Sequence, residues 1–369
     1  MHVSSVLPGA AVGAAAVAVL VLAAAPAHAA APGSVPVPGC GVVLTSDAHL
    51  ADDLTCPSGD GLHLGPGVTL DLRGHVLRGA GGTGVTVAEE GDMRVVGGTI
   101  SGWGRGIFTG SAEEYGEVAG ALTVERVTLR GNRSAVVGSP DYAGSSKDLL
   151  VDRSTLVGNR YGFYSLGATA TFRRTTFSAN GTGVEVGPSR VVLEDSRVQG
   201  NDVGLACDRS SCTLAGTTLV ANGVALRGSW MTDLRVDDST FLGNDVGIDA
   251  TDEHVWTRVD ASRFTDNGTA VVASTQMAVH GSTFRRNDVG FTTEDGEYWQ
   301  ADGYSVLADN RFLDGGDGVV TDEEIDLRGN SAVGNRGWGI HALHAVDLGG
   351  NTARGNGNEP QCVGVVCGP

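Results

Sequence analysis

The chain has 369 residues, with 25 Lys and Arg against 43 Asp and Glu, which gives a formal net charge of −18 at pH 7. A surface this acidic disfavours the anionic backbone of nucleic acids, so we expect no nucleic-acid partner. The 57 glycines indicate frequent turns rather than disorder, because regularly spaced apolar residues persist between them.

The N-terminus has the pattern of an export signal. Residues 9–25 are a continuous run of Ala, Val, Leu and Gly, followed by Ala27-His28-Ala29. An apolar run with a small-x-small cleavage site predicts a signal peptide at residues 1–29 and a secreted, extracellular protein. Residues 1–8 contain no Lys or Arg, which leaves a non-cleaved anchor as the alternative. No later segment is apolar enough to span a membrane, so we expect no stable insertion after cleavage.

The six cysteines form three close pairs, as expected for an exported protein stabilised by disulfides. The predicted bonds are Cys40–Cys56, Cys207–Cys212 and Cys362–Cys367. Zinc binding is disfavoured because no two pairs have matching ligand spacing. Residues 30–39, rich in Pro and Ala, read as a linker, residues 40–66 as an N-terminal cap, and residues 359–369 as a disulfide-linked C-terminal cap.

A repeat of about 21 residues dominates the chain between the caps. Its anchor residues are Asn132, Asn159, Asn180, Asn201, Asn222, Asn244, Asn267, Asn287, Asn335 and Asn356. Relative to each Asn, apolar residues recur eight and three positions before it and four positions after it, as at Val124, Leu129 and Val136. Short alternating runs separated by Gly-rich turns are typical of strands. Residues 67–358 are thus predicted to be an all-β, right-handed parallel β-helix of about twelve coils.

The repeated Asn is expected to have a structural role. It lies at a sharp turn, where Asn tolerates the left-handed backbone conformation better than most residues. In register, the Asn side chains can also hydrogen-bond from coil to coil. A catalytic role for this column is disfavoured.

Candidate functional residues lie where the repeat is interrupted. The connection that follows the third strand of each coil varies in length, and these connections are expected to stack into one ridge. Acidic and aromatic side chains are frequent on it. The candidate catalytic residues are Asp252, Glu253, His254, Glu294 and Asp295, and the candidate substrate-binding residues are Tyr115, Trp230, Trp256, Tyr298 and Trp299.

Aromatic rings beside carboxylates suit the faces and hydroxyl groups of a sugar chain. Asp322 and Glu323 are candidate ligands for Ca²⁺, which prefers oxygen ligands and could bridge the protein to an acidic polysaccharide. His254 follows two carboxylates, which favours it among the histidines as a titrating group. The alternative is that these polar loops are simply solvated.

The segments Val68-Thr-Leu-Asp-Leu-Arg-Gly-His, Gly98-Thr-Ile-Ser-Gly-Trp-Gly-Arg-Gly-Ile and the Gly-Asn-Asp-Val-Gly units resemble the pectin-lyase-like superfamily of right-handed β-helices, in particular its exported actinobacterial repeat proteins. This resemblance spans roughly residues 40–369 and implies a fold rather than an activity. The Arg-x-Pro-x-x-Arg and Trp-x-Asp-His elements of pectate lyases are absent from the sequence, as are the combined motifs of polygalacturonases and alginate epimerases.

Two functions follow from these observations. In the first, the protein binds a polysaccharide or cell-wall glycan along the ridge and, if it is an enzyme, acts as a polysaccharide lyase, epimerase or glycoside hydrolase. In the second, it is a non-catalytic structural or adhesion protein of the cell envelope, with the coil serving as a rigid rod.

Overall fold

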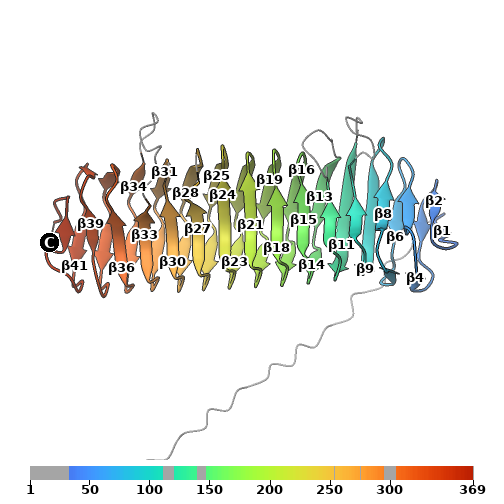
Figure 1. Ribbon diagram of the computed structural model, residues 1–369, viewed down its shortest axis with the longest axis horizontal. Coiled ribbons are helices and arrows are strands. Elements are labelled where there is room, and N and C mark those ends of the chain that lie inside the picture. Colours follow the sequence, from blue (N-terminus) through green and yellow to red (C-terminus); the bar gives the residue numbers. More distant parts are fainter. Residues whose placement is uncertain are drawn as a thin grey trace, which may run out of the picture.

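The computed structural model describes residues 33–110, 120–138, 147–252, 254–274, 276–294 and 305–368. These residues form an all-β, right-handed parallel coil of about 13 turns, whose strands lie across the long axis of a rod (Figure 1). No helix occurs in these ranges, and hence none that is long and apolar enough to cross a bilayer. Each coil contributes strands to three parallel ladders.

The first ladder contains β1 (Val35–Pro36), β3 (Ala48–His49), β6 (Thr69–Asp71), β9 (Met93–Ser101), β11 (Ala121–Arg130), β13 (Asp148–Asp152), β16 (Thr169–Arg173), β19 (Arg190–Glu194), β22 (Ser211–Ala215), β25 (Asp233–Asp237), β28 (Trp256–Asp260), β31 (Met277–His280), β34 (Val306–Ala308), β37 (Asp326–Arg328) and β40 (Val346–Asp347).

The second ladder contains β4 (Leu54–Cys56), β7 (Val76–Gly79), the C-terminal parts of β9 and β11, β14 (Thr155–Val157), β17 (Thr176–Ser178), β20 (Arg197–Gln199), β23 (Thr218–Val220), β26 (Thr240–Leu242), β29 (Arg263–Thr265), β32 (Thr283–Arg285), β35 (Arg311–Leu313), β38 (Ser331–Val333) and β41 (Thr352–Arg354).

The third ladder contains β2 (Val42–Leu44), β5 (Leu62–Leu64), β8 (Thr83–Val87), β10 (Arg105–Phe108), β12 (Ser134–Val137), β15 (Tyr161–Ser165), β18 (Thr182–Val186), β21 (Val203–Asp208), β24 (Val224–Ser229), β27 (Val246–Ala250), β30 (Thr269–Ala273), β33 (Val289–Thr293), β36 (Asp317–Thr321), β39 (Ile340–Ala342) and β42 (Cys362–Val363).

The three apolar columns of the repeat form the core, as predicted. Val124, Leu129 and Val136, one from each ladder of a single coil, are fully buried. Identical residues stack directly: the rings of Phe241 and Phe264 have centroids 4.6 Å apart and lie 10° from parallel. This distance matches the spacing of about 4.8 Å between paired strands, so the coil itself sets the packing distance.

The Asn column forms a buried hydrogen-bonded ladder between the second and third strands, which confirms its structural role. Asn201 donates its side-chain amide to Asn222 Oδ1 at 3.0 Å and to the Phe177 carbonyl at 3.3 Å. The expectation that Asn itself adopts the left-handed conformation is wrong. That conformation belongs to the preceding residue, for example Gly200 with φ 60° and Ala221 with φ 53°. The turn before each Asn aims its side chain inward, where it meets backbone groups.

A second Asn ladder, which the repeat did not predict, occupies the corner between the first two ladders near the C-terminus. Asn310 donates to Asn330 Oδ1 at 3.1 Å, and Asn330 to Asn351 Oδ1 at 3.2 Å. Ser282 continues this column toward the N-terminus, since its backbone N–H donates to Asn310 Oδ1 at 2.9 Å. Buried amides therefore replace hydroxyls at this corner as the coil approaches its end.

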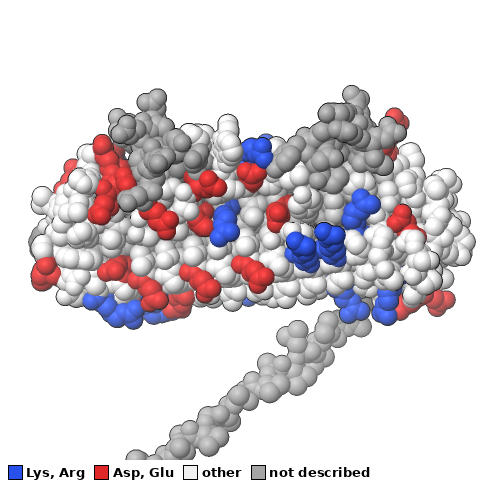
Figure 2. All heavy atoms as spheres, in the orientation of Figure 1, with Lys and Arg blue, Asp and Glu red and all other residues white. Residues whose placement is uncertain are grey.

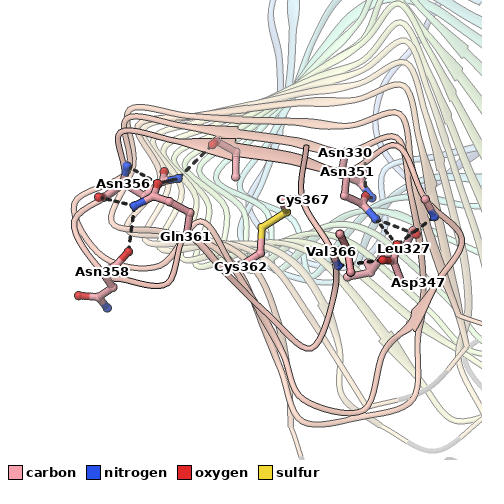
Figure 3. Close-up of a disulfide and its surroundings, with 12 residues drawn as sticks. Leu327, Asn330, Asp347, Asn351, Asn356, Asn358, Gln361, Cys362, Val366 and Cys367 are labelled. Carbon is pink, nitrogen blue, oxygen red and sulfur yellow. Dashed lines mark hydrogen bonds between the residues drawn. A yellow bond between two sulfur atoms is a disulfide. The ribbon is translucent and has the colours of Figure 1, made fainter. Parts of the chain in front are cut away.

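All three predicted disulfides are present, and two of them lie at the ends of the coil. Figure 3 shows Cys362–Cys367 beside Gln361, which ends the main Asn ladder by accepting hydrogen bonds from Asn356 through Oε1. The strands extend beyond the predicted helical range of residues 67–358. β1, which lies inside the predicted linker, pairs with β3. β42, which lies inside the predicted C-terminal cap, pairs with β39.

Candidate functional site

The register places the predicted ridge residues along one flank, at the ends of third-ladder strands. Asp252 follows β27, Glu294 follows β33 and Asp322 follows β36. Neighbouring strand ends are linked: the Glu294 N–H donates to the Ala273 carbonyl at 2.9 Å, and the Thr293 and Thr321 hydroxyls lie 2.8 Å apart. Asp252 and Glu294 are two coils apart, or roughly 10 Å, and Asp322 lies one coil further on.

This spacing argues against a shared metal centre on the ridge. Within the part of the chain that the structure describes, no three His, Cys, Asp or Glu side chains are grouped closely enough to hold a metal ion. At Asp322 and Glu323, the clearest contact is internal, since the Glu323 N–H donates to Thr321 Oγ1 at 3.0 Å. Ca²⁺ binding there therefore rests on two carboxylates alone. The candidates Tyr115, Glu253, Asp295, Tyr298 and Trp299 lie outside the described residues.

Two predicted aromatic residues are exposed on adjacent connections of the ridge. Trp230 is 53 % exposed and Trp256 is 44 % exposed. The Trp256 N–H donates to the carbonyl of Thr232, two residues after Trp230, at 2.8 Å. The ring of His254 lies 6.3 Å from that of Trp256 with an interplanar angle of 27°. Trp230, His254 and Trp256, which lie on two adjacent coils, are called the aromatic cluster below.

Among the described residues, a concave site lies elsewhere, on the outer face of the third ladder toward the N-terminus. It is a groove of about 490 Å³. The lining residues are Gly82, Gly104, Arg105, Arg133, Ser134, Val137, Tyr161, Tyr164 and Glu185. None of these residues was among the candidates predicted from the sequence. This set of residues is called the groove below.

A break in the alternation of side chains on β12 produces the hollow, because Ala135 and Val136 both face the core and Ser134 and Val137 both line the groove. Ser134 and Val137 point outward from β12, and both are small and buried. Ser134 pairs with Arg105 on one side and with Tyr161 on the other, and Val137 pairs with Tyr164. Small residues on the middle strand thus form a floor between longer side chains on β10 and β15.

The groove carries positive charge on an acidic protein. The Arg105 guanidinium lies 4.5 Å from the centre of the Phe108 ring, and that of Arg160 lies 5.1 Å from the centre of the Tyr161 ring. The ion pairs found among the described residues do not include Arg105, Arg133 or Arg160. In Figure 2, basic side chains gather on the N-terminal half of this face, whereas acidic side chains prevail toward the C-terminus.

This combination suits an anionic sugar. Guanidinium groups held against aromatic rings keep their charge and remain available for carboxylate or sulfate oxygens. The rings of Tyr161 and Tyr164, with centroids 5.4 Å apart, provide apolar faces and hydroxyl groups beside these cations. Glu185 adds one carboxylate to the lining. The groove therefore offers both charge and stacking surfaces within a single concave site.

A sequence signal for the groove exists in the residue after each anchor Asn. That position holds Arg133 and Arg160 in two successive coils, but Gly or Asp in the next coils, as at Gly181 and Asp202. The candidates predicted from the sequence lie at interruptions of the repeat. The groove residues instead occupy regular positions of the repeat, where interruptions give no signal.

The comparisons with known proteins agree with the architecture. Residues 115–255 match a family model described as a right handed beta helix region. No curated protein and no solved structure matches the chain. The matched segment continues into coils of the same register on both sides, from β1 to β42. The chain therefore has the fold of a right-handed parallel β-helix.

Proposed function

We propose that the protein binds an anionic polysaccharide in the groove on the outer face of its third ladder. The observation that carries this proposal is the concentration of Arg105, Arg133, Tyr161 and Tyr164 around a groove of about 490 Å³, in a chain of net charge −18. The fold is consistent with this role, because β-helices present long, rigid faces to extended ligands.

We further propose that the protein acts outside the cell. Its three disulfides are compatible with an oxidising, extracellular environment. The apolar segment at residues 9–25 supports cleavage of a signal peptide after Ala29. N-terminal sequencing of the protein recovered from the culture medium tests this. A mature chain beginning at Ala30 agrees with the proposal, whereas a protein retained in the cell with residues 1–29 intact contradicts it.

Calorimetric titration tests the binding proposal directly. Polygalacturonate and hyaluronan are the anionic probes, and dextran is the neutral one. The anionic probes should bind and dextran should not. The double variant Arg105→Ala/Arg133→Ala should weaken anionic binding about tenfold or more, because a hydrogen bond to a charged group contributes about 1.5–3 kcal/mol.

Arg190→Ala/Arg263→Ala is the matched control, since Arg190 on the first ladder and Arg263 on the second are exposed arginines. It removes the same two charges and should leave the affinity within about twofold of the native value, because long-range effects of surface charges are screened at physiological salt. Equal losses in the two variants would show that the groove has no special role. Equal binding of dextran would show that charge is not recognised.

A further inference from the structure

The exposed aromatic cluster on the ridge is the second unusual surface of the molecule. Away from the two ends of the coil, the large apolar side chains exposed among the described residues are Trp230, Met231, Leu242 and Trp256. Three of these four lie on two adjacent coils: Trp230 and Met231 follow β24, and Trp256 is the first residue of β28. Such a concentration at one place marks an interaction surface, because single exposed apolar residues are normally scattered.

The backbone presents these side chains at a conformational cost. Trp230 has φ 26°, Met231 φ 51° and His254 φ 55°, in the region that bulky residues rarely adopt. Hydrogen bonds hold the connection in place: the Arg209 N–H donates to the Trp230 carbonyl at 2.8 Å, and Thr232 Oγ1 to the Cys207 carbonyl at 3.1 Å. Cys207 is itself fixed by its disulfide to Cys212. The cluster is therefore held rigidly while its rings stay exposed.

The groove lies on the third ladder, and the cluster lies at the corner where that ladder passes into the first, since Trp230 follows β24 and Trp256 is the first residue of β28. The third ladder faces the viewer in Figure 1, and the ridge follows the upper edge, where β19, β25 and β28 begin. From β15, which carries Tyr164, to β24, which precedes Trp230, the coil advances by three strands, or about 14 Å. Trp256 lies one coil beyond, at about 19 Å.

The outward side chains between the two sites belong to one column of the third ladder. After Tyr164 this column contains Glu185, Ala206 and Arg227. Glu185 belongs to the lining of the groove, and Arg227 is tied to Asp249 of the following coil by an ion pair of 2.9 Å. The small side chain of Ala206 between them leaves room for a chain that continues from the groove toward the corner.

The charge changes along this path. Arg105 and Arg133 favour an anionic unit at the groove. Near the aromatic cluster, Asp208 and Asp233 are ion-paired with Arg209 and Arg235, at 3.1 and 3.5 Å. These paired charges offer an acidic sugar little net attraction, whereas the face of a neutral sugar can stack on an indole ring. The same balance of charge offers little attraction to an anionic membrane.

We propose that Trp230 and Trp256 form a second subsite, which stacks a neutral sugar unit of the same polymer whose acidic unit occupies the groove. This inference rests on the proposed function. It names the ligand class more closely, as a polysaccharide that contains both acidic and neutral units. Two linked contacts make the second binding event intramolecular, so affinity should rise with chain length once both sites are spanned.

Hyaluronan oligosaccharides test this, because acidic and neutral units alternate along them. From β10, which carries Arg105, to β24 the coil advances by five strands, or about 24 Å, so a tetrasaccharide held at Arg105 ends before the cluster, whereas a dodecasaccharide can reach it. The native protein should bind the dodecasaccharide roughly tenfold more tightly or better than the tetrasaccharide. In Trp230→Ala/Trp256→Ala most of this gain should disappear while the tetrasaccharide affinity stays unchanged. Leu242→Ala, which removes an exposed apolar side chain on the second ladder, should keep the gain.

Three outcomes would overturn the inference. A gain with length that survives in Trp230→Ala/Trp256→Ala, or that is absent from the native protein, removes the second subsite and leaves groove binding intact, because the tetrasaccharide still binds. Loss of a native dimer in that variant, measured by sedimentation, would assign the cluster to a second copy of the chain. If neither oligosaccharide binds and Arg105→Ala/Arg133→Ala has no effect, the proposed function fails together with the inference. Unchanged thermal melting of each variant confirms that it is folded.

Discussion

The side chain of Asn201 connects three successive coils. Its amide donates to Asn222 Oδ1 and to the Phe177 carbonyl, and its carbonyl oxygen accepts the backbone N–H of Asn180 at 2.9 Å and the Asn180 side-chain amide at 3.0 Å. Asn201 is 3 % exposed, so water cannot replace these partners. Buried polar groups that lose their partners cost free energy of folding, and several would lose them at once.

Replacing this residue should therefore be costly. Asn201→Leu leaves the Asn180 N–H and the Phe177 carbonyl without their partners. At about 1–3 kcal/mol for each unsatisfied group, the free energy of unfolding should fall by about 2–6 kcal/mol. Urea denaturation measures it. Asp202→Ala, at the exposed neighbour, should change stability by no more than about 0.5 kcal/mol. Equal losses in the two variants would contradict the structural role of the ladder.

At the same scale, the sequence was sufficient to predict the role of the Asn column but not its geometry. A column of identical polar residues in register leaves few alternatives to a hydrogen-bonded ladder. The position of the left-handed residue was wrong by one, because Gly200 and Ala221 show that the turn precedes the Asn. Sequence spacing alone does not distinguish a residue that makes a turn from one whose side chain the turn points inward.

At the scale of the elements, the carboxylate of Asp347 links several groups at the C-terminal end of the coil. Asp347, at the end of β40, accepts hydrogen bonds from the backbone N–H groups of Val366 and Gly349 at 2.8 and 2.9 Å, and one from the Asn351 side chain (Figure 3). The Val366 and Gly349 amides lower the pKa of Asp347 below its usual value, since they stabilise the charged form. This group ties the last residues to the second Asn ladder.

The closure of this end should depend on pH. Because the pKa of Asp347 is lowered in the folded state, its contribution is present above the unfolded value of about 3.9 and is lost as the pH falls through the folded value. Protection of the Val366 amide from hydrogen exchange should therefore be high at neutral pH and fall in acid. Asp347→Asn should show low protection throughout. Protection that is independent of pH in the native protein would contradict this role.

The ends of the coil were also the elements that sequence reasoning described least well. β1 and β42 have only two residues each and lie outside the Asn repeat. Strands this short have no detectable alternation, so their pairing with β3 and β39 depends on the template that the coil provides. The predicted boundaries therefore differ from the observed ones at both termini.

For the whole molecule, the repeat was enough to predict the architecture, since ten anchor positions at nearly constant spacing are compatible with few folds. It also predicted the alignment of Asp252, Glu294 and Asp322 along the ridge. The groove required the structure, because its shape arises from a contrast between strands: small Ser134 and Val137 lie between Arg105 and Tyr161. Such contrasts across coils are visible only when the register is known.

The most direct test of glycan recognition is a crystal structure of the protein with an acidic oligosaccharide bound at saturating concentration. Electron density is expected over β10, β12 and β15, with a carboxylate of the sugar beside the Arg105 and Arg133 guanidinium groups and a ring against Tyr161 or Tyr164. Sugar bound to the first or second ladder instead, or an empty groove at saturation, would contradict the assignment of this face as the binding site.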